Sequence, residues 1–91
     1  MRIGISVTNR YEVKDVRQGV RWMIERAKAA AEAGLDSLSF GDHHASLTPS
    51  YQNTPILARS LAVWRDAPAG ALYLLPFRHP VLLAEEIGTL A

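Results

Sequence analysis

Strand-like and helix-like segments alternate three times along this chain of 91 residues, and this alternation limits the possible folds more than any other feature. At the start, Ile3, Ile5 and Val7 alternate with small residues, which is typical of a strand with two different faces. The predicted strands cover residues 2–7, 36–41 and 69–76. The third is mostly apolar, as expected of a strand buried on both faces of a parallel sheet. Strict alternation with helices predicts an α/β fold with parallel strands and right-handed crossovers.

The predicted helices have recognisable ends. Asp15 followed by Gln18 has the spacing of a capping box, and Gly34 stands where a left-handed C-terminal cap is expected. Thr54-Pro55 predicts an N-cap followed by proline at the first helical position, and His79-Pro80 opens a third helix. The apolar stripe of the first helix consists of Val16, Val20, Met23, Ile24, Ala27 and Ala31.

The length conflicts with this architecture. Three parallel strands form an open sheet with two free edges and thinly covered faces. A β/α barrel has eight strand–helix units and about 250 residues. We therefore expect residues 1–91 to be the N-terminal part of a single β/α-barrel domain, with its first three units.

Composition excludes several classes of protein. The formal net charge is +1, without the basic excess of nucleic-acid-binding or membrane-surface proteins. There is no cysteine, which rules out disulfides, zinc–thiolate sites and thiol nucleophiles. Apolar runs are much shorter than the roughly 20 residues that span a bilayer, and no secretory signal is visible. A soluble, cytoplasmic protein with no nucleic-acid or membrane partner is expected.

The candidate site lies at the carboxyl ends of the strands, where β/α folds bind their ligands. All three histidines follow the second or third strand, beside Asp42 and Arg78. By strand parity His43 continues the face assigned to the interior, so it is the stronger candidate for a general acid or base. His44 points toward the helices, where a structural role is at least as plausible. Asp42 either orients a histidine or caps the following turn.

Two further residues near this site leave alternatives open. Arg78 could bind a phosphate or carboxylate, or it could be a solvated side chain. His79 is expected to serve the start of the third helix. No Gly-rich phosphate loop, dinucleotide fingerprint or nucleophile elbow is present, so no nucleotide site of those classes is encoded here.

The triplet Asp42-His43-His44 also raises a metal hypothesis, because a carboxylate and two imidazoles are a ligand set. The same triplet is the namesake signature of the DHH phosphoesterases, which hold manganese. That family has further aspartate motifs upstream, whereas only Asp15 and Asp36 precede the triplet here, at a predicted cap and a strand start. This metal hypothesis is the least favoured interpretation of the triplet, and no metal ligand is assigned.

Two runs resemble the bacterial luciferase-like monooxygenases, which are flavin-dependent β/α-barrel oxidoreductases. Ala31–His44 is similar to that family's second strand, with its pattern Ala-x-x-x-Gly-Phe-Asp-x-x-Trp, an acidic residue and one or two histidines. Leu74–Glu86 is similar to its third strand, loop and helix, which carry Leu-Pro-x-x-His-Pro. Leu35, Ser39 and Phe40 depart from the first pattern, where Phe and an apolar-Trp pair are common, and the change is conservative. The resemblance extends over nearly the whole chain but covers only about the first third of a family member.

The resemblance implies that His43 faces a flavin and assists proton transfer, with Asp42 as the preceding acidic residue. It also implies a cis peptide near Ala71-Leu72 that braces the flavin ring. The cofactor would be reduced FMN or a deazaflavin, the substrate a small organic molecule, and the flavin-phosphate site would lie outside these residues. We therefore expect the chain to be inactive alone. The alternative from another class is a non-catalytic module that completes a barrel with another chain or forms a homo-oligomer.

Overall fold

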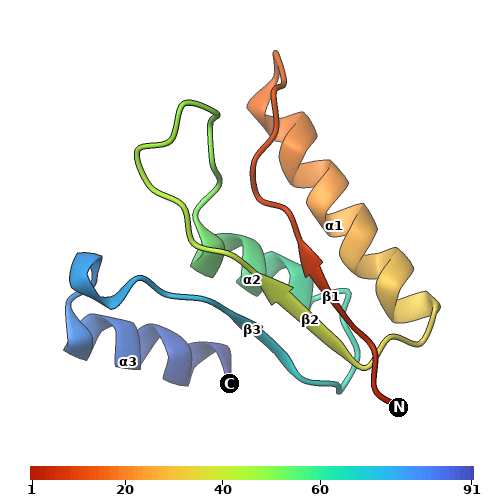
Figure 1. Ribbon diagram of the computed structural model, residues 1–91. Coiled ribbons are helices and arrows are strands. Elements are labelled where there is room, and N and C mark those ends of the chain that lie inside the picture. The colour runs from red at the N-terminus through yellow and green to blue at the C-terminus, as the bar shows by residue number, and fades with distance from the viewer.

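The computed structural model describes residues 1–91 as an open three-stranded parallel sheet with three helices (Figure 1). The elements are β1 (Gly4–Val7), α1 (Val16–Glu32), β2 (Ser37–Phe40), α2 (Asn53–Leu61), β3 (Ala69–Ala71), the 3-10 turn η1 (Leu75–Phe77) and α3 (Pro80–Leu90). The strand order is β1-β2-β3. This confirms the α/β class and the parallel sheet. The architecture is compatible with part of a β/α barrel, and no closed barrel is present.

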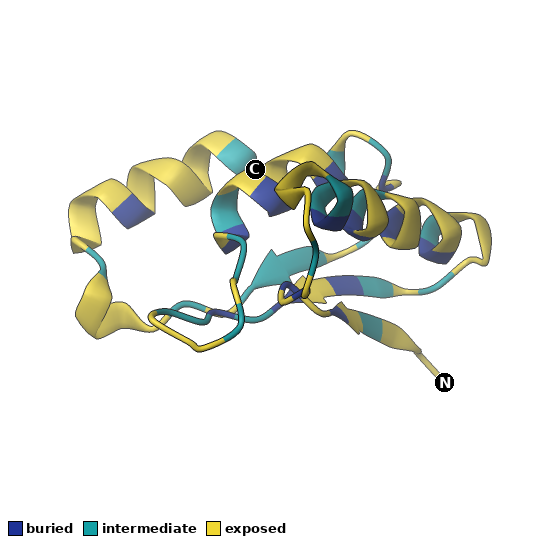
Figure 2. Cartoon of the chain, turned by 90° about the horizontal axis from the view of Figure 1, so that it is seen from above, coloured by how far each residue is buried: buried dark blue, intermediate teal, exposed yellow.

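The helices lie on one side of the sheet, and the core fills the space between them (Figure 2). β2 is the central strand, and Leu38 and Phe40 on its helix-facing side are almost fully buried. Met23 and Ala27 of α1 are buried in the same cluster. The predicted stripe of α1 is therefore partly confirmed, although Val16 at its beginning is exposed.

The opposite side of the sheet is uncovered. Gly4, Ser6 and Ser39 on this side are exposed, and Gly70 pairs with Ser39 in the register of β2 and β3. Side chains alternate between the two faces of a strand, so the uncovered face consists mainly of small residues. We call this surface the open face.

The helix ends agree only partly with the predicted caps. Gly34 has φ 78°, as its predicted C-terminal role requires. The Asp15 carboxylate accepts a hydrogen bond from the Arg17 N–H at 2.9 Å, so the cap is confirmed but the capping box with Gln18 is wrong. α2 begins at Asn53 rather than after Thr54, so the N-cap predicted at Thr54 is wrong; Asn53 is buried, and its Oδ1 accepts from the Thr54 N–H at 2.9 Å.

The third strand is shorter and more exposed than predicted. β3 ends at Ala71, and its residues are half-buried rather than buried on both faces. The Leu72 N–H still donates to Phe40 O at 2.8 Å, but the Leu74 N–H bonds the Asp42 carboxylate instead of a strand. The chain then turns into η1, and Leu74, Leu75 and Phe77 are exposed. A side-chain acceptor therefore ends the strand where its apolar sequence would have continued it.

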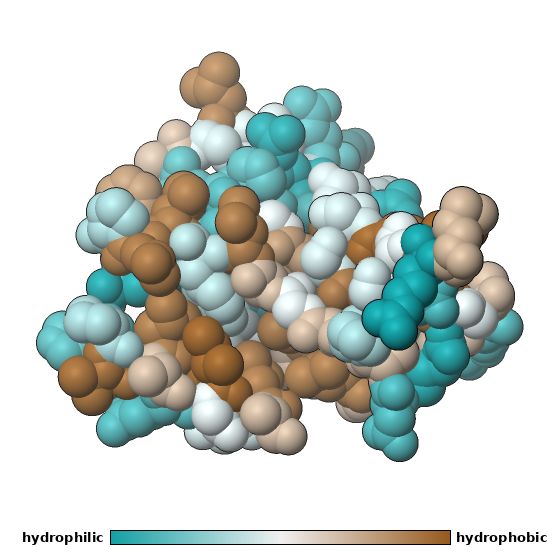
Figure 3. All heavy atoms as spheres, turned by 60° about the horizontal axis from the view of Figure 1, so that its bottom comes forward, coloured by the Kyte–Doolittle hydropathy of each residue, from teal (hydrophilic) through white to brown (hydrophobic).

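The third helix packs loosely. Leu83 is the buried residue of α3, whereas Val81, Leu82 and Ile87 are exposed. Apolar side chains consequently gather on the surface of this part of the molecule (Figure 3). Each of the helices is too short or too polar to cross a membrane.

Candidate functional site

Asn9 joins the ends of the first two strands. It follows β1, the residue is 1% exposed, and its Nδ2 group donates to Gly41 O at 3.1 Å and to Tyr51 O at 3.0 Å. Its own carbonyl accepts from the Tyr51 N–H. The sequence pattern places Asn9 in a polar connection, but its parity with Ile5 and Val7 is the signal that could have identified it as buried.

His43 rests on Asn9 and Gly41. The ring atom Nδ1 lies 2.9 Å from Asn9 Oδ1, and the residue is half-buried. A Cβ added to Gly41 would lie 2.9 Å from His43 Cε1, so the ring covers the side of Gly41 that continues the open face from Ser39. The structure thus places His43 at the carboxyl end of β2, on the face of Ser39 and Gly41 that strand parity assigns to it. That face is uncovered here, and not interior as expected, because no element packs on this side of the three strands.

Asp42 contacts His44 and not His43, which is the histidine expected to act as a general acid or base. Its carboxylate is 1% exposed and accepts from the Leu74 N–H at 2.8 Å, while His44 Nε2 lies 2.8 Å from Oδ1. The His44 contact lies outside hydrogen-bond angles, so it acts chiefly as an ion pair when His44 is protonated. His44 also packs edge-on against Phe77, with ring centroids 5.4 Å apart. These contacts give His44 a structural role.

Arg78 completes a buried polar cluster with Asp42 and Asn53. Its Nη2 lies 3.4 Å from Asp42 Oδ1 and 3.2 Å from Asn53 Oδ1, and the guanidinium stands over the Tyr73 ring. The Arg78 side chain is 19% exposed, so the alternative prediction that it is a solvated side chain is wrong. Asn53 Nδ2 also donates to Leu72 O. The cluster therefore fastens α2 and the end of β2 to the chain that leaves β3.

The cluster keeps Asp42 ionised. Burial acts to raise the pKa of Asp42, but the Leu74 N–H hydrogen bond, His44 and the Arg78 charge together outweigh it. The pKa of Asp42 is consequently lower than its usual value. Asp42 is thus a fixed negative charge that holds two segments together, rather than a proton donor near neutral pH.

The two adjacent histidines do not converge on one point. His43 faces Asn9 and His44 faces Asp42, and no group of three His, Cys, Asp or Glu side chains is close enough to hold a metal ion. The hypothesis of a manganese phosphoesterase therefore loses its geometric basis. His79 is the N-cap residue of α3, as predicted, but its side chain makes no capping hydrogen bond.

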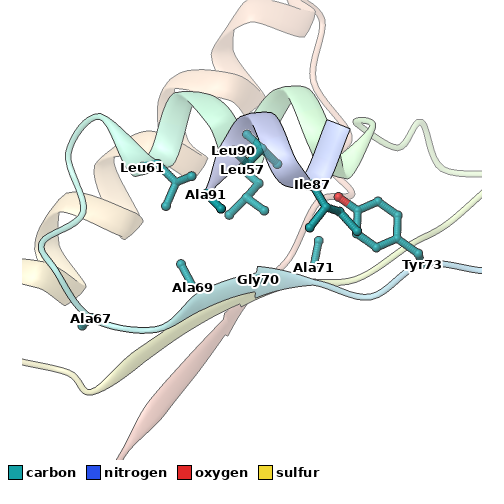
Figure 4. Close-up of a pocket in the computed structure, with 10 residues that line it drawn as sticks. All are labelled: Leu57, Leu61, Ala67, Ala69, Gly70, Ala71, Tyr73, Ile87, Leu90 and Ala91. Atoms are coloured by element: carbon teal, nitrogen blue, oxygen red, sulfur yellow. The ribbon is translucent and has the colours of Figure 1, made fainter. Parts of the chain in front are cut away.

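The strand end expected to brace a flavin has an ordinary backbone. No cis peptide bond is present, so the expected cis bond at Ala71-Leu72 is wrong; the Leu72 N–H continues the ladder to Phe40 through trans geometry. By the register of β2 and β3, Leu72 lies on the open face, like Gly41. Ala71 points the other way, toward α2 and α3 (Figure 4).

The chain is similar to the 3,6-diketocamphane 1,6-monooxygenase of Pseudomonas putida, with 31% identity over 80 residues. The alignment covers 86% of this chain and 21% of that protein, so the chain spans about a fifth of its relative's length. No protein-family model matches the chain, and no solved structure matches it. At a coarse level, the similarity suggests an oxidoreductase family.

Proposed function

We propose that these residues form the flavin-facing start of a luciferase-like oxidoreductase that acts on a small organic substrate. The observation that carries the proposal is the position of His43 at the carboxyl ends of the strands, held on the open face beside Gly41 and Leu72. A monooxygenase similar to most of this chain supports the same reaction class. The proposed cofactor is reduced FMN or a deazaflavin.

The open face fits the flat ring of a flavin. Its side chains are small apart from Leu72 and His43, and a Cβ added to Gly70 would meet nothing within 4 Å, so a planar group can approach the backbone closely. A bound flavin supplies the redox chemistry. His43 would hold or move a proton at the edge of the ring, and Leu72 would contact the ring face. Asp42 and Arg78 would keep the two strand ends at a fixed separation.

According to the proposal, the residues that contact the phosphate group of the flavin are not among these 91. The purified chain should therefore bind riboflavin and FMN with similar, weak affinity and should show no turnover. A fluorescence titration with both ligands tests this, with His43→Gln as the site variant and His79→Gln as the matched control. The proposal predicts weaker binding for the first variant alone. Strong preference for FMN, turnover by residues 1–91, or equal effects of both variants would contradict it.

A second candidate function is that of a module completed by another chain. Exposed apolar residues line α3 and the end of β3, and a groove of about 400 Å³ opens between β3, α2 and α3 (Figure 4). The outer edge of β3 has no strand partner. Light scattering after size exclusion decides this candidate: an assembly supports it, and a monomer at all concentrations contradicts it.

A further inference from the structure

The hydrogen bonds of Asn9 determine which way its amide points. The atom assigned as Nδ2 faces two carbonyl oxygens, Gly41 O at 3.1 Å and Tyr51 O at 3.0 Å. Carbonyl oxygens only accept hydrogen bonds, so the amide group facing them has to be the NH₂. The reverse orientation would place the amide oxygen against two carbonyl oxygens, at a residue that is only 1% exposed. Asn9 Oδ1 is therefore the atom that faces His43.

This orientation also fixes the proton on the histidine. His43 Nδ1 lies 2.9 Å from Asn9 Oδ1, which can only accept. In a neutral imidazole one nitrogen carries the proton and the other is a free acceptor. We infer that Asn9 is a positioning residue that holds neutral His43 as its Nδ1–H tautomer, with Nε2 left as the basic atom.

Nε2 is the nitrogen available to a ligand. None of the side-chain hydrogen bonds of the protein involves His43 Nε2, although Nδ1 is engaged. The ring lies over Gly41 on the open face, so its second nitrogen belongs to the surface proposed to receive the flavin. The catalytic meaning of the tautomer rests on that proposed function: Nε2 would accept the proton. The tautomer itself follows from the hydrogen bonds alone.

His44 provides an internal contrast. Its Nε2 lies 2.8 Å from Oδ1 of the ionised Asp42 carboxylate. A nitrogen lone pair at that distance would be repelled by the carboxylate, so neutral His44 is expected to carry its proton on Nε2 even though the angles are poor for a hydrogen bond. Two adjacent histidines are therefore expected to be protonated on opposite nitrogens when both are neutral. A general preference of histidine for one tautomer cannot produce this difference.

The test is a long-range ¹H–¹⁵N spectrum of the uniformly labelled 91-residue chain, recorded about two pH units above the ordinary histidine value of about 6.5. His43→Gln assigns the His43 signals by their loss. The expected result is a pyrrole-like Nδ1 and a pyridine-like Nε2 for His43, with the reverse pattern for His44. A His43 spectrum dominated by the Nε2–H form overturns the inference. The wild-type protein alone is enough to show this, because His43→Gln serves only to assign the signals.

Two substitutions then assign the effect to Asn9. Asn9→Ala removes the acceptor and should shift His43 toward the Nε2–H form, with His79 unchanged. Asn9→Gln keeps an NH₂ for the two carbonyls and an oxygen for Nδ1, and should retain the Nδ1–H form. An unchanged tautomer in Asn9→Ala, or its loss in a folded Asn9→Gln, contradicts the role given to Asn9. If neither variant folds, the wild-type spectrum still decides whether His43 carries its proton on Nδ1. No flavin is used, so flavin binding can fail without affecting this result.

Discussion

Replacing Arg78 by Met should destabilise the protein because it leaves the Asp42 charge buried with fewer partners. The Asp42 side chain is 1% exposed, and the Arg78 guanidinium also contacts Asn53 Oδ1. Breaking a buried ion pair by removing one partner costs about 3–5 kcal/mol. The Leu74 N–H and His44 remain beside the carboxylate, and Arg78 is partly exposed. We therefore expect a loss of about 2 kcal/mol in the free energy of unfolding, below that range.

Urea denaturation followed by circular dichroism measures this loss. For a domain of this size, about 2 kcal/mol corresponds to a fall in Tm of roughly 10 °C. The matched control is Arg17→Met, because Arg17 contacts Asp15 on the surface with its own side chain 85% exposed. That pair should contribute about 0.5 kcal/mol or less. Equal losses in the two variants would refute the argument that burial of Asp42 makes the Arg78 contact important.

Four further predictions concern charge, packing and backbone geometry. The pKa of Asp42 is lower in the folded protein, so its contribution to stability should be present above about pH 4 and disappear as pH falls through the folded pKa; urea midpoints should therefore fall more steeply for wild type than for Asp42→Asn. Met23→Ala empties a fully buried position and should cost about 2–5 kcal/mol, measured by the same denaturation. Gly41→Ala should displace the His43 ring, because the new Cβ would lie 2.9 Å from Cε1, and the His43 resonances should shift more than those of His79. Gly34→Ala should cost about 1–2 kcal/mol because φ is 78° there, and an unchanged Tm would contradict the left-handed cap.

Periodicity predicted those parts of the fold that depend on local sequence. The alternation around Leu38 and Phe40 identified the second strand and the side of it that faces the helices, and Gly34 identified the end of α1. These features follow from side-chain parity and backbone freedom, which neighbouring residues determine. The same parity placed His43 on the face of Ser39 and Gly41, although it predicted that face to be interior and the structure leaves it uncovered.

The features of the structure that the sequence did not predict depend on polar side chains that contact distant parts of the chain. Asn9 and Asn53 look like loop residues in the sequence, yet both are buried and bind backbone carbonyls far along the chain. Asp42 ends β3 by bonding the Leu74 N–H, although the apolar sequence favours a longer strand. Such contacts satisfy buried backbone groups and depend on tertiary packing, so hydrophobic periodicity alone does not reveal them.

The most direct test of the proposed function is to map where a flavin contacts the chain. Backbone ¹H–¹⁵N spectra of the labelled protein are recorded during a titration with riboflavin, with His43→Gln as the comparison. The proposal predicts shifts concentrated at Gly41, His43, Gly70 and Leu72, reduced in the variant. Shifts confined to the apolar groove lined by Leu57, Leu61 and Ile87, or none at millimolar flavin, would contradict it.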